Sequence, residues 1–234
     1  MSIFDTYCII CIFLINILVY TNAEDHRMVR ALKSLQYRNI LPSKLHYILD
    51  IGAYSGEWTS FMKSNLGFPD ASFIMFEGNK DKESMLKTIG EEYVIGLIGD
   101  IDGKIITYHV AGESNSPHVS TGNSIFLENT LAFENSNFEI RHEVMTTIDA
   151  ILTRKEYEEN EAICLLEIEL DDVFNHNNNN IELIKCINNM KQTNINIWID
   201  IIKFDIQGAE LLGLTGAKET IEKFQPIIVM ESSI

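Results

Sequence analysis

Three acidic residues stand at the ends of predicted strands and could bind a ligand there. Asp50, Glu77 and Asp205 each close a short apolar run that is typical of a buried strand. In a doubly wound α/β sheet, ligands lie outside the carboxyl ends of the strands. A carboxylate after the first strand could face a cationic amine or sulfonium, and one after the second could accept both hydroxyls of a ribose. We therefore expect the three carboxylates to converge on one crevice.

Two glycines follow the first of these carboxylates, within the sequence DIGAYSG at positions 50–56. A strand, a tight turn and the start of a helix are predicted here. A dinucleotide fingerprint beginning at Gly52 would need glycines where Tyr54 and Glu57 stand, and no phosphate-loop lysine follows Gly56. The spacing suits a nucleotide-like ligand without a pyrophosphate, such as S-adenosylmethionine.

The elements that must position these residues alternate between strands and helices from Leu45 onward. This alternation predicts a Rossmann-like α/β fold, which is a doubly wound, mostly parallel sheet with helices on both faces. The predicted strands are Tyr47–Ile51, Ser72–Phe76, Tyr93–Ile98, Lys104–Val110, Phe138–Val144, Trp198–Asp205 and Pro226–Glu231. The predicted helices are Glu57–Asn65, Asp81–Ile89 and Ala209–Phe224.

Two segments interrupt this alternation. Gly112–Asn123 is a loop rich in Ser, Gly and Asn that is long enough to act as a lid. An acidic and then asparagine-rich segment at about 155–196 is predicted to be a low-complexity insertion. His118 on the loop and His142 near the end of a predicted strand are candidate general bases, weaker by position than Asp205.

The N-terminal segment is predicted to have a separate role. Tyr7–Tyr20 is an almost unbroken apolar run, too short as a helix for a hydrocarbon core of about 30 Å, and the small residues Thr21-Asn22-Ala23 follow it. Residues 1–23 are expected to be a cleavable signal peptide or, alternatively, an uncleaved single-pass anchor. Residues 24–44 would form a helical lead-in to a domain at 45–234. The expected location is the secretory pathway, in the lumen of the endoplasmic reticulum or Golgi or outside the cell.

The charge balance restricts the partners. The 234 residues include 34 Asp and Glu against 18 Lys and Arg, which gives a formal charge of −16. Nucleic-acid phosphates are bound by clustered Lys and Arg, so nucleic acid is not expected as a partner, and membrane contact is expected only through the N-terminal segment. No His and Cys cluster has the spacing of a metal site, so no metal is expected.

Read together, several segments resemble the FkbM family of S-adenosylmethionine-dependent methyltransferases. They occur in the family's order between about residues 45 and 232, and the block Lys203–Glu210 is the most specific to the family. The resemblance implies a class I methyltransferase with S-adenosylmethionine as cofactor, most often acting on a hydroxyl oxygen of a carbohydrate or another small molecule. The matching segments are Asp50–Gly56, Phe76–Asn79, Gly99–Gly103, Thr147–Asp149, Ile202–Glu210 and Ile228–Glu231.

This interpretation assigns roles to individual residues. Asp205 is the first candidate for the general base, and Ser124 and Asn123 are expected to hold the acceptor. Glu210 would orient Lys203 or the amine of the cofactor. The predicted cofactor-binding residues, among which Ile98 would pack against the adenine, are Asp50, Gly52, Ala53, Tyr54, Gly56, Glu77, Gly78, Asn79, Ile98, Gly99 and Asp205.

The chain also departs from the family pattern. Gln207 stands where the family usually has Glu, which removes a charge beside the reaction centre. The sequence stops after the predicted strand Pro226–Glu231, where class I methyltransferases continue to an antiparallel strand pair, so an open sheet edge is expected there. These departures leave a second function open, a catalytically impaired cofactor-binding module of the same fold. A nicotinamide-dependent oxidoreductase is disfavoured by the missing dinucleotide fingerprint.

Overall fold

The computed structural model describes residues 10–13, 16–21, 25–67, 70–111, 124–126, 138–155 and 198–231. The chain divides into two compact units, one made of Met1–Ile148 with Trp198–Ile234 and one of Asp149–Ile197. In the second unit, residues 149–155 are described and are helical. The predicted lid loop Gly112–Asn123, with His118, and the predicted insertion from residue 156 onward lie outside the described residues.

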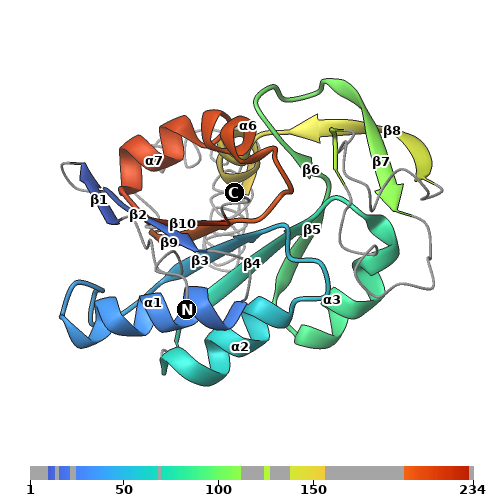
Figure 1. Ribbon diagram of the computed structural model, residues 1–234. Coiled ribbons are helices and arrows are strands. Elements are labelled where there is room, and N and C mark those ends of the chain that lie inside the picture. The colour runs from blue at the N-terminus through green and yellow to red at the C-terminus, as the bar shows by residue number, and fades with distance from the viewer. Residues whose placement is uncertain are drawn as a thin grey trace, which may run out of the picture. The chain divides into compact units, whose positions relative to one another are not determined.

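A seven-stranded sheet forms the centre of the first unit (Figure 1). Its order is β1-β2-β10-β9-β3-β4-β5, and every neighbouring pair is parallel except β1 with β2. The mostly parallel sheet of an α/β fold, predicted from the sequence, is therefore confirmed. The strands are β1 (Ile10–Phe13), β2 (Asn16–Thr21), β3 (Tyr47–Ile51), β4 (Ser72–Glu77), β5 (Glu92–Ile95), β9 (Ile199–Phe204) and β10 (Ile227–Glu231).

Helices cover both faces of this sheet, with α1, α2 and α3 on one side and α6 and α7 on the other (Figure 1). On the first side, Ile48 of β3 and Ile201 of β9 pack in one buried cluster with Leu32 of α1 and Trp58 of α2. The apolar stripe of each helix is thereby removed from water. The helices are α1 (Asp25–Tyr37), α2 (Glu57–Leu66), the 3₁₀ turn η1 (Lys80–Lys82), α3 (Glu83–Ile89), α6 (Glu210–Thr215) and α7 (Lys218–Phe224).

One predicted helix, Ala209–Phe224, is two helices in the structure. α6 ends at Thr215 and α7 begins at Lys218, with Gly216 between them. A Cβ atom on Gly216 would lie 1.9 Å from the carbonyl oxygen of Gly99, so two backbone segments meet here and a side chain has no room. The prediction of a single helix is wrong because the break depends on a contact with a distant segment.

A smaller sheet of three strands has the order β6-β8-β7. β7 (Ile105–Ala111) and β8 (Phe138–Thr146) are antiparallel, and β6 (Leu97–Ile98) runs parallel to β8. The predicted strand Tyr93–Ile98 therefore belongs to both sheets, with β5 in the large one and β6 in the small one. This change of sheet brings Leu97 into an apolar cluster with Tyr108 of β7.

The edge of β10 is paired, which overturns the expectation of an open edge. β2 runs parallel to β10 with Val19 opposite Val229, and β1 folds back on β2. The described part of the predicted signal or anchor at 1–23 thus consists of strands, and α1 lies within the predicted lead-in at 24–44. No helix among the described residues is both long and apolar enough to cross a membrane. Cleavage of residues 1–23 and a secretory location stay predictions.

Removal of residues 1–22 should destabilise the folded protein, because it deletes both β1 and β2 and leaves β10 without its outer partner. Each backbone hydrogen bond contributes about 0.5–1.5 kcal/mol net, and each kcal/mol corresponds to about 2–4 °C in Tm for a chain of this size. We expect a lower Tm and faster hydrogen exchange at the amides of 228–231. Deletion of residues 1–9 alone is the control, and identical melting of both truncated proteins would contradict the pairing.

Candidate functional site

A cavity of about 250 Å³ opens at the carboxyl ends of β3, β4 and β9. Seven of the predicted cofactor-binding residues line it, and these are Gly52, Ala53, Tyr54, Glu77, Gly78, Ile98 and Asp205. The other predicted residues of this group, Asp50, Gly56, Asn79 and Gly99, do not line it. The cavity therefore lies where the sequence predicts a ligand. The four predicted residues that do not line it belong to strand β3 or to the turns around the cavity.

The turn after β3 fits closely between the ends of the two neighbouring strands. The amides of Gly52 and Ala53 both donate to the carbonyl oxygen of Phe76, each at 2.9 Å. Gly52 has a φ of +81°, and a Cβ atom on it would lie 1.9 Å from the carbonyl oxygen of Asp205. Glycine is required here for both reasons. Gly56, with a φ of +77°, begins α2 as its N-cap.

Glu77 joins the turn after β3 to the turn after β4. Its two carboxylate oxygens accept the amides of Tyr54 at 2.8 Å and Asn79 at 2.7 Å. Each oxygen keeps a further acceptor position for a ligand. Burial raises the pKa of this carboxyl above its ordinary value, although the two backbone hydrogen bonds and the charges of Lys203 and Lys82 act in the opposite direction.

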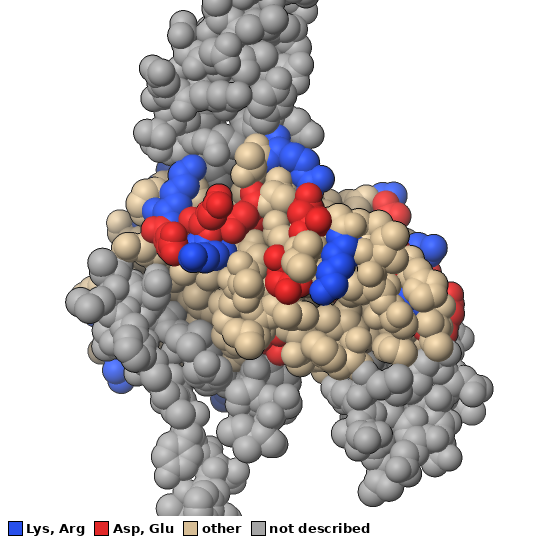
Figure 2. All heavy atoms as spheres, turned by 90° about the horizontal axis from the view of Figure 1, so that it is seen from above, with Lys and Arg blue, Asp and Glu red and all other residues tan. Residues whose placement is uncertain are grey.

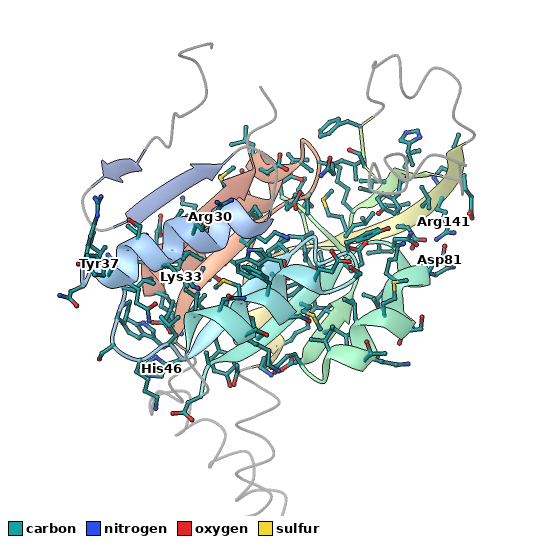
Figure 3. The ribbon with its side chains drawn as sticks, turned by 60° about the horizontal axis from the view of Figure 1, so that its bottom comes forward. Arg30, Lys33, Tyr37, His46, Asp81 and Arg141 are labelled. Carbon is teal, nitrogen blue, oxygen red and sulfur yellow. The ribbon has the colours of Figure 1, made fainter. Side chains whose placement is uncertain are left out.

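Asn79 and its neighbours hold the rim of the β4 turn instead of lining the cavity. The side-chain oxygen of Asn79 accepts the amide of Asp81 at 3.0 Å and caps η1. Arg141 of β8 donates to that same oxygen at 3.3 Å and to the Asp81 carboxylate at 2.8 Å (Figure 3). The hairpin of β7 and β8 is thereby fastened to the loop after β4 by an arginine that is also bound to Glu139.

Asp50 forms a buried ion pair under the cavity. Its side chain is fully buried, and its two oxygens lie 3.0 Å from Lys203 Nζ and 2.7 Å from the donating hydroxyl of Thr59. Asp50 and Lys203 are opposite residues of β3 and β9. Lys203 lines the cavity and also lies 3.3 Å from the carbonyl oxygen of Gly52. Asp50 therefore does not line the cavity. It contacts Lys203, which does.

Asp205 is the most accessible of the three carboxylates, with 22% of its side chain exposed. One oxygen accepts the side-chain amide of Gln207 at 3.0 Å, and the other lies 3.4 Å from Lys203 Nζ. Gln207 itself has a φ of +52°, and its carbonyl oxygen accepts the Ser124 hydroxyl at 2.9 Å. Ser124 also lines the cavity, and its hydroxyl holds the backbone of Gln207 beside the Asp205 carboxylate.

Four predicted residues remain, and the structure describes two of them, Glu210 and His142. One oxygen of Glu210 accepts the amides of Ile206 and Gly208, at 3.1 and 3.2 Å, so this carboxylate caps the turn after β9. Its predicted role toward the amine of the cofactor stays a prediction. His142 lies on β8, is exposed and does not line the cavity. His118 and Asn123 lie outside the described residues. Within the described residues, no group of His, Cys, Asp and Glu could hold a metal ion.

Several lining residues were not predicted from the sequence as cofactor-binding or catalytic residues, and they include Lys203, Trp58, Leu97 and Tyr108. Burial, with the nearby charge of Glu77, raises the pKa of the Tyr108 phenol far above its ordinary value, so it is a neutral hydroxyl at the cavity wall. The only local signal was a polar side chain inside an apolar run, as with Lys203 in β9. Trp58, Leu97 and Tyr108 have no such signal, because their positions depend on how α2, β6 and β7 pack or pair with segments distant in the sequence.

The ionisable lining of the cavity is mostly acidic. Among its lining residues, Glu57, Glu77 and Asp205 carry carboxylates and Lys203 carries an ammonium group. Such a lining favours a ligand with positive charge and disfavours a pyrophosphate. On the face shown in Figure 2, Lys and Arg side chains lie beside Asp and Glu side chains, so its described part presents no continuous basic surface.

Comparison with known proteins supports a methyltransferase. A family model of the methyltransferase FkbM domain matches residues 192–233, a short stretch near the C-terminus that includes β9, α6, α7 and β10. The resemblance to FkbM methyltransferases is confirmed by this match. It includes Lys203 and Asp205 at the cavity, and Gln207 beside them. No curated protein and no solved structure matches the chain.

Substitution Lys203→Met should strongly destabilise the ligand-free protein, because it leaves the fully buried Asp50 carboxylate without its cation. Breaking a buried pair in this way costs about 3–5 kcal/mol. Lys63→Met is the matched control, since Lys63 pairs with Glu91 at the surface and its loss should cost less than about 1 kcal/mol. Urea unfolding measures both, and a loss at Lys203 no larger than at Lys63 would show that the pair contributes little.

Proposed function

We propose that this protein is an S-adenosylmethionine-dependent methyltransferase that methylates a hydroxyl oxygen of a carbohydrate or another small molecule. The observation that carries the proposal is the cavity at the carboxyl ends of β3, β4 and β9, where Glu77 and Asp205 converge and where the matched family segment supplies Lys203 and Asp205. Its acidic lining fits a cofactor with a sulfonium and an ammonium group.

The residues of the cavity fit the parts of this cofactor. Glu77 is fixed by two backbone amides and would accept the ribose hydroxyls with its remaining acceptor positions. Leu97 and Ile98 are buried at the wall and would pack against the adenine. When bound, the cofactor supplies an electrophilic methyl group. The protein's own task is to orient the acceptor and to exclude water, and orientation of this kind contributes about 7–11 kcal/mol.

Asp205 would take the proton of the acceptor hydroxyl. Its side chain is held between Gln207 and Lys203, so the carboxylate is fixed before an acceptor arrives. The same hydrogen bond from Gln207 supports the second candidate function, a binding module without turnover, because one oxygen of Asp205 is already occupied.

Asp205→Asn should separate binding from turnover. We expect calorimetric affinity for S-adenosylmethionine to stay within a few fold, while release of S-adenosylhomocysteine in the presence of hydroxylated small molecules falls about 10²–10⁴-fold, as for the loss of a general base. Glu222→Gln on the exposed face of α7 is the control. Binding of S-adenosylmethionine by the unchanged protein without any turnover would favour the binding module. Tighter binding of NAD than of S-adenosylmethionine would overturn the proposed cofactor.

Acidification should weaken cofactor binding through Glu77 at a higher pH than for an ordinary glutamate. Because burial raises its pKa, the carboxylate that accepts ribose hydroxyls is lost early as the pH falls. The effect on folding has the opposite sign: a pKa raised in the folded state contributes stability below the unfolded-state pKa, and this is lost as the pH rises through the folded-state pKa.

The variant Glu77→Gln tests the pH dependence of cofactor binding and that of folding stability. It should bind S-adenosylmethionine more weakly than the unchanged protein at neutral pH, and its affinity should lack the acid-side loss between the ordinary glutamate range and neutrality. Calorimetry at several pH values measures the affinity, and thermal unfolding of the ligand-free proteins measures the stability. The same pH dependence of binding in both proteins would exclude Glu77 as the titrating ligand group.

A further inference from the structure

The negative charge of the chain is distributed unevenly. The chain contains 34 Asp and Glu in all, yet residues 26–49 contain none of them. This segment covers most of α1, the loop after it and the start of β3. Exposed charges more than about 8 Å apart are largely screened at physiological ionic strength, so local charge decides what this surface can bind. Its Lys and Arg residues are Arg27, Arg30, Lys33, Arg38 and Lys44.

The basic side chains of α1 lie on the stripe of the helix that faces solvent. Arg30, Lys33 and Tyr37 have the three- and four-residue spacing of one helical face, and all three are exposed (Figure 3). Leu32 and Leu35 lie on the opposite stripe and are buried in the cluster between the helices and the sheet. The core therefore uses the apolar stripe of α1, and the basic stripe is left for solvent or a partner.

The end of α1 places two large apolar side chains next to these charges. Asn39 follows the helix with a φ of +56°. The amide of Ile40 then donates to the carbonyl oxygen of Leu35 at 2.9 Å, as in a Schellman motif, which fixes the backbone here. Even so, Tyr37 is 90% exposed and Ile40 is 44% exposed. Neighbouring apolar side chains held in water in this way are typical of an interaction site.

The loop after α1 extends the same surface, because Arg38 and Lys44 are both exposed. The neighbouring helix α2 has one acidic and one basic residue, Glu57 and Lys63, so it adds no net charge. The excess of positive charge therefore remains on α1 and its loop. We call the following six residues the basic α1 surface: Arg30, Lys33, Tyr37, Arg38, Ile40 and Lys44.

We propose that the basic α1 surface binds a membrane that contains anionic lipids. Clusters of about four to eight Lys and Arg on an amphipathic helix are attracted to anionic headgroups. Tyrosine and apolar side chains beside such a cluster enter the headgroup region, while the long basic side chains reach the phosphates. The sequence predicts membrane contact only through residues 1–23, so this surface is a second point of contact. It does not depend on the proposed function, because none of its residues lines the cavity.

The exposed apolar side chains favour a membrane over a soluble linear polyanion. Such a polyanion would be bound by the charges of Arg30, Lys33, Arg38 and Lys44 alone. It has no apolar layer that Tyr37 could enter. A membrane uses both parts of the surface, so removal of the charges and removal of the ring should each weaken binding.

Sedimentation of the full chain with vesicles tests the proposal. The probes are vesicles of phosphatidylcholine alone and vesicles in which about a third of the lipid is phosphatidylserine. We expect binding to the anionic vesicles only, and less binding as salt rises from about 0.1 M to 1 M, because the Debye length falls from about 10 Å to 3 Å. Binding to neither kind of vesicle would overturn the proposal. Equal binding to both would assign the contact to the apolar N-terminal segment and overturn it too.

Two variants separate the charges from the ring. Each Lys or Arg near an anionic surface strengthens binding about fivefold, so Arg38→Gln combined with Lys44→Gln should weaken it about 10- to 30-fold. Tyr37→Ser should weaken it about three- to tenfold. Lys218→Gln on α7 and Leu211→Ser on α6 are the matched controls, since both side chains are exposed on the other side of the sheet. Losses as large in the controls would contradict the assigned surface.

Two further measurements keep the result decisive. All the substituted side chains are exposed, so each variant should melt within about 2 °C of the unchanged protein, and Lys44→Gln alone replaces the double variant if that does not fold. In Tyr37→Trp, the added tryptophan should shift its emission to shorter wavelength with anionic vesicles. Heparin is the soluble polyanion for comparison. Tight binding of heparin, with vesicle binding unchanged in Tyr37→Ser, would assign the surface to a linear polyanion and overturn the membrane proposal.

Discussion

The buried ion pair between Asp50 and Lys203 is the interaction on which the site depends. It joins the two central strands β3 and β9 at opposite positions, and both side chains are almost completely removed from water. Such a pair is tolerated only when its remaining polar positions are satisfied, and Thr59 and the Gly52 carbonyl do this. The ammonium group also lies 3.4 Å from Asp205. The Lys203 ammonium group, which neutralises the buried Asp50 carboxylate, therefore also orients the Asp205 carboxylate at the cavity.

Three carboxylates that look alike in the sequence have three different surroundings in the fold. Each closes an apolar strand, and the alternation of strands and helices was enough to predict the parallel sheet and the end of it at which the cavity lies. The partner of each carboxylate could not be predicted. Asp50 contacts Lys203 because β9 lies next to β3, and that order is decided by pairing between segments far apart in the sequence.

The unpredicted parts share the same physical origin. The break at Gly216 depends on the carbonyl oxygen of Gly99, and the place of Trp58 in the cavity wall depends on how α2 packs over the sheet. An apolar run such as Tyr7–Tyr20 has no period, so its sequence cannot distinguish a helix from strands. The described part of that run is strand, because the edge of β10 offers a ladder of unpaired backbone groups that β2 occupies.

The pairing of β2 with β10 has a consequence for biosynthesis. Almost the entire length of the sequence separates Val19 from Val229, yet the two residues are neighbours in the sheet. During translation the first strands leave the ribosome long before their partner exists, and contacts over such a separation form slowly. The nascent chain must therefore leave one edge of this apolar segment, the edge of β2 that does not pair with β1, unpaired until β10 is made. A chaperone that shields this segment would act on a requirement that the strand order itself imposes.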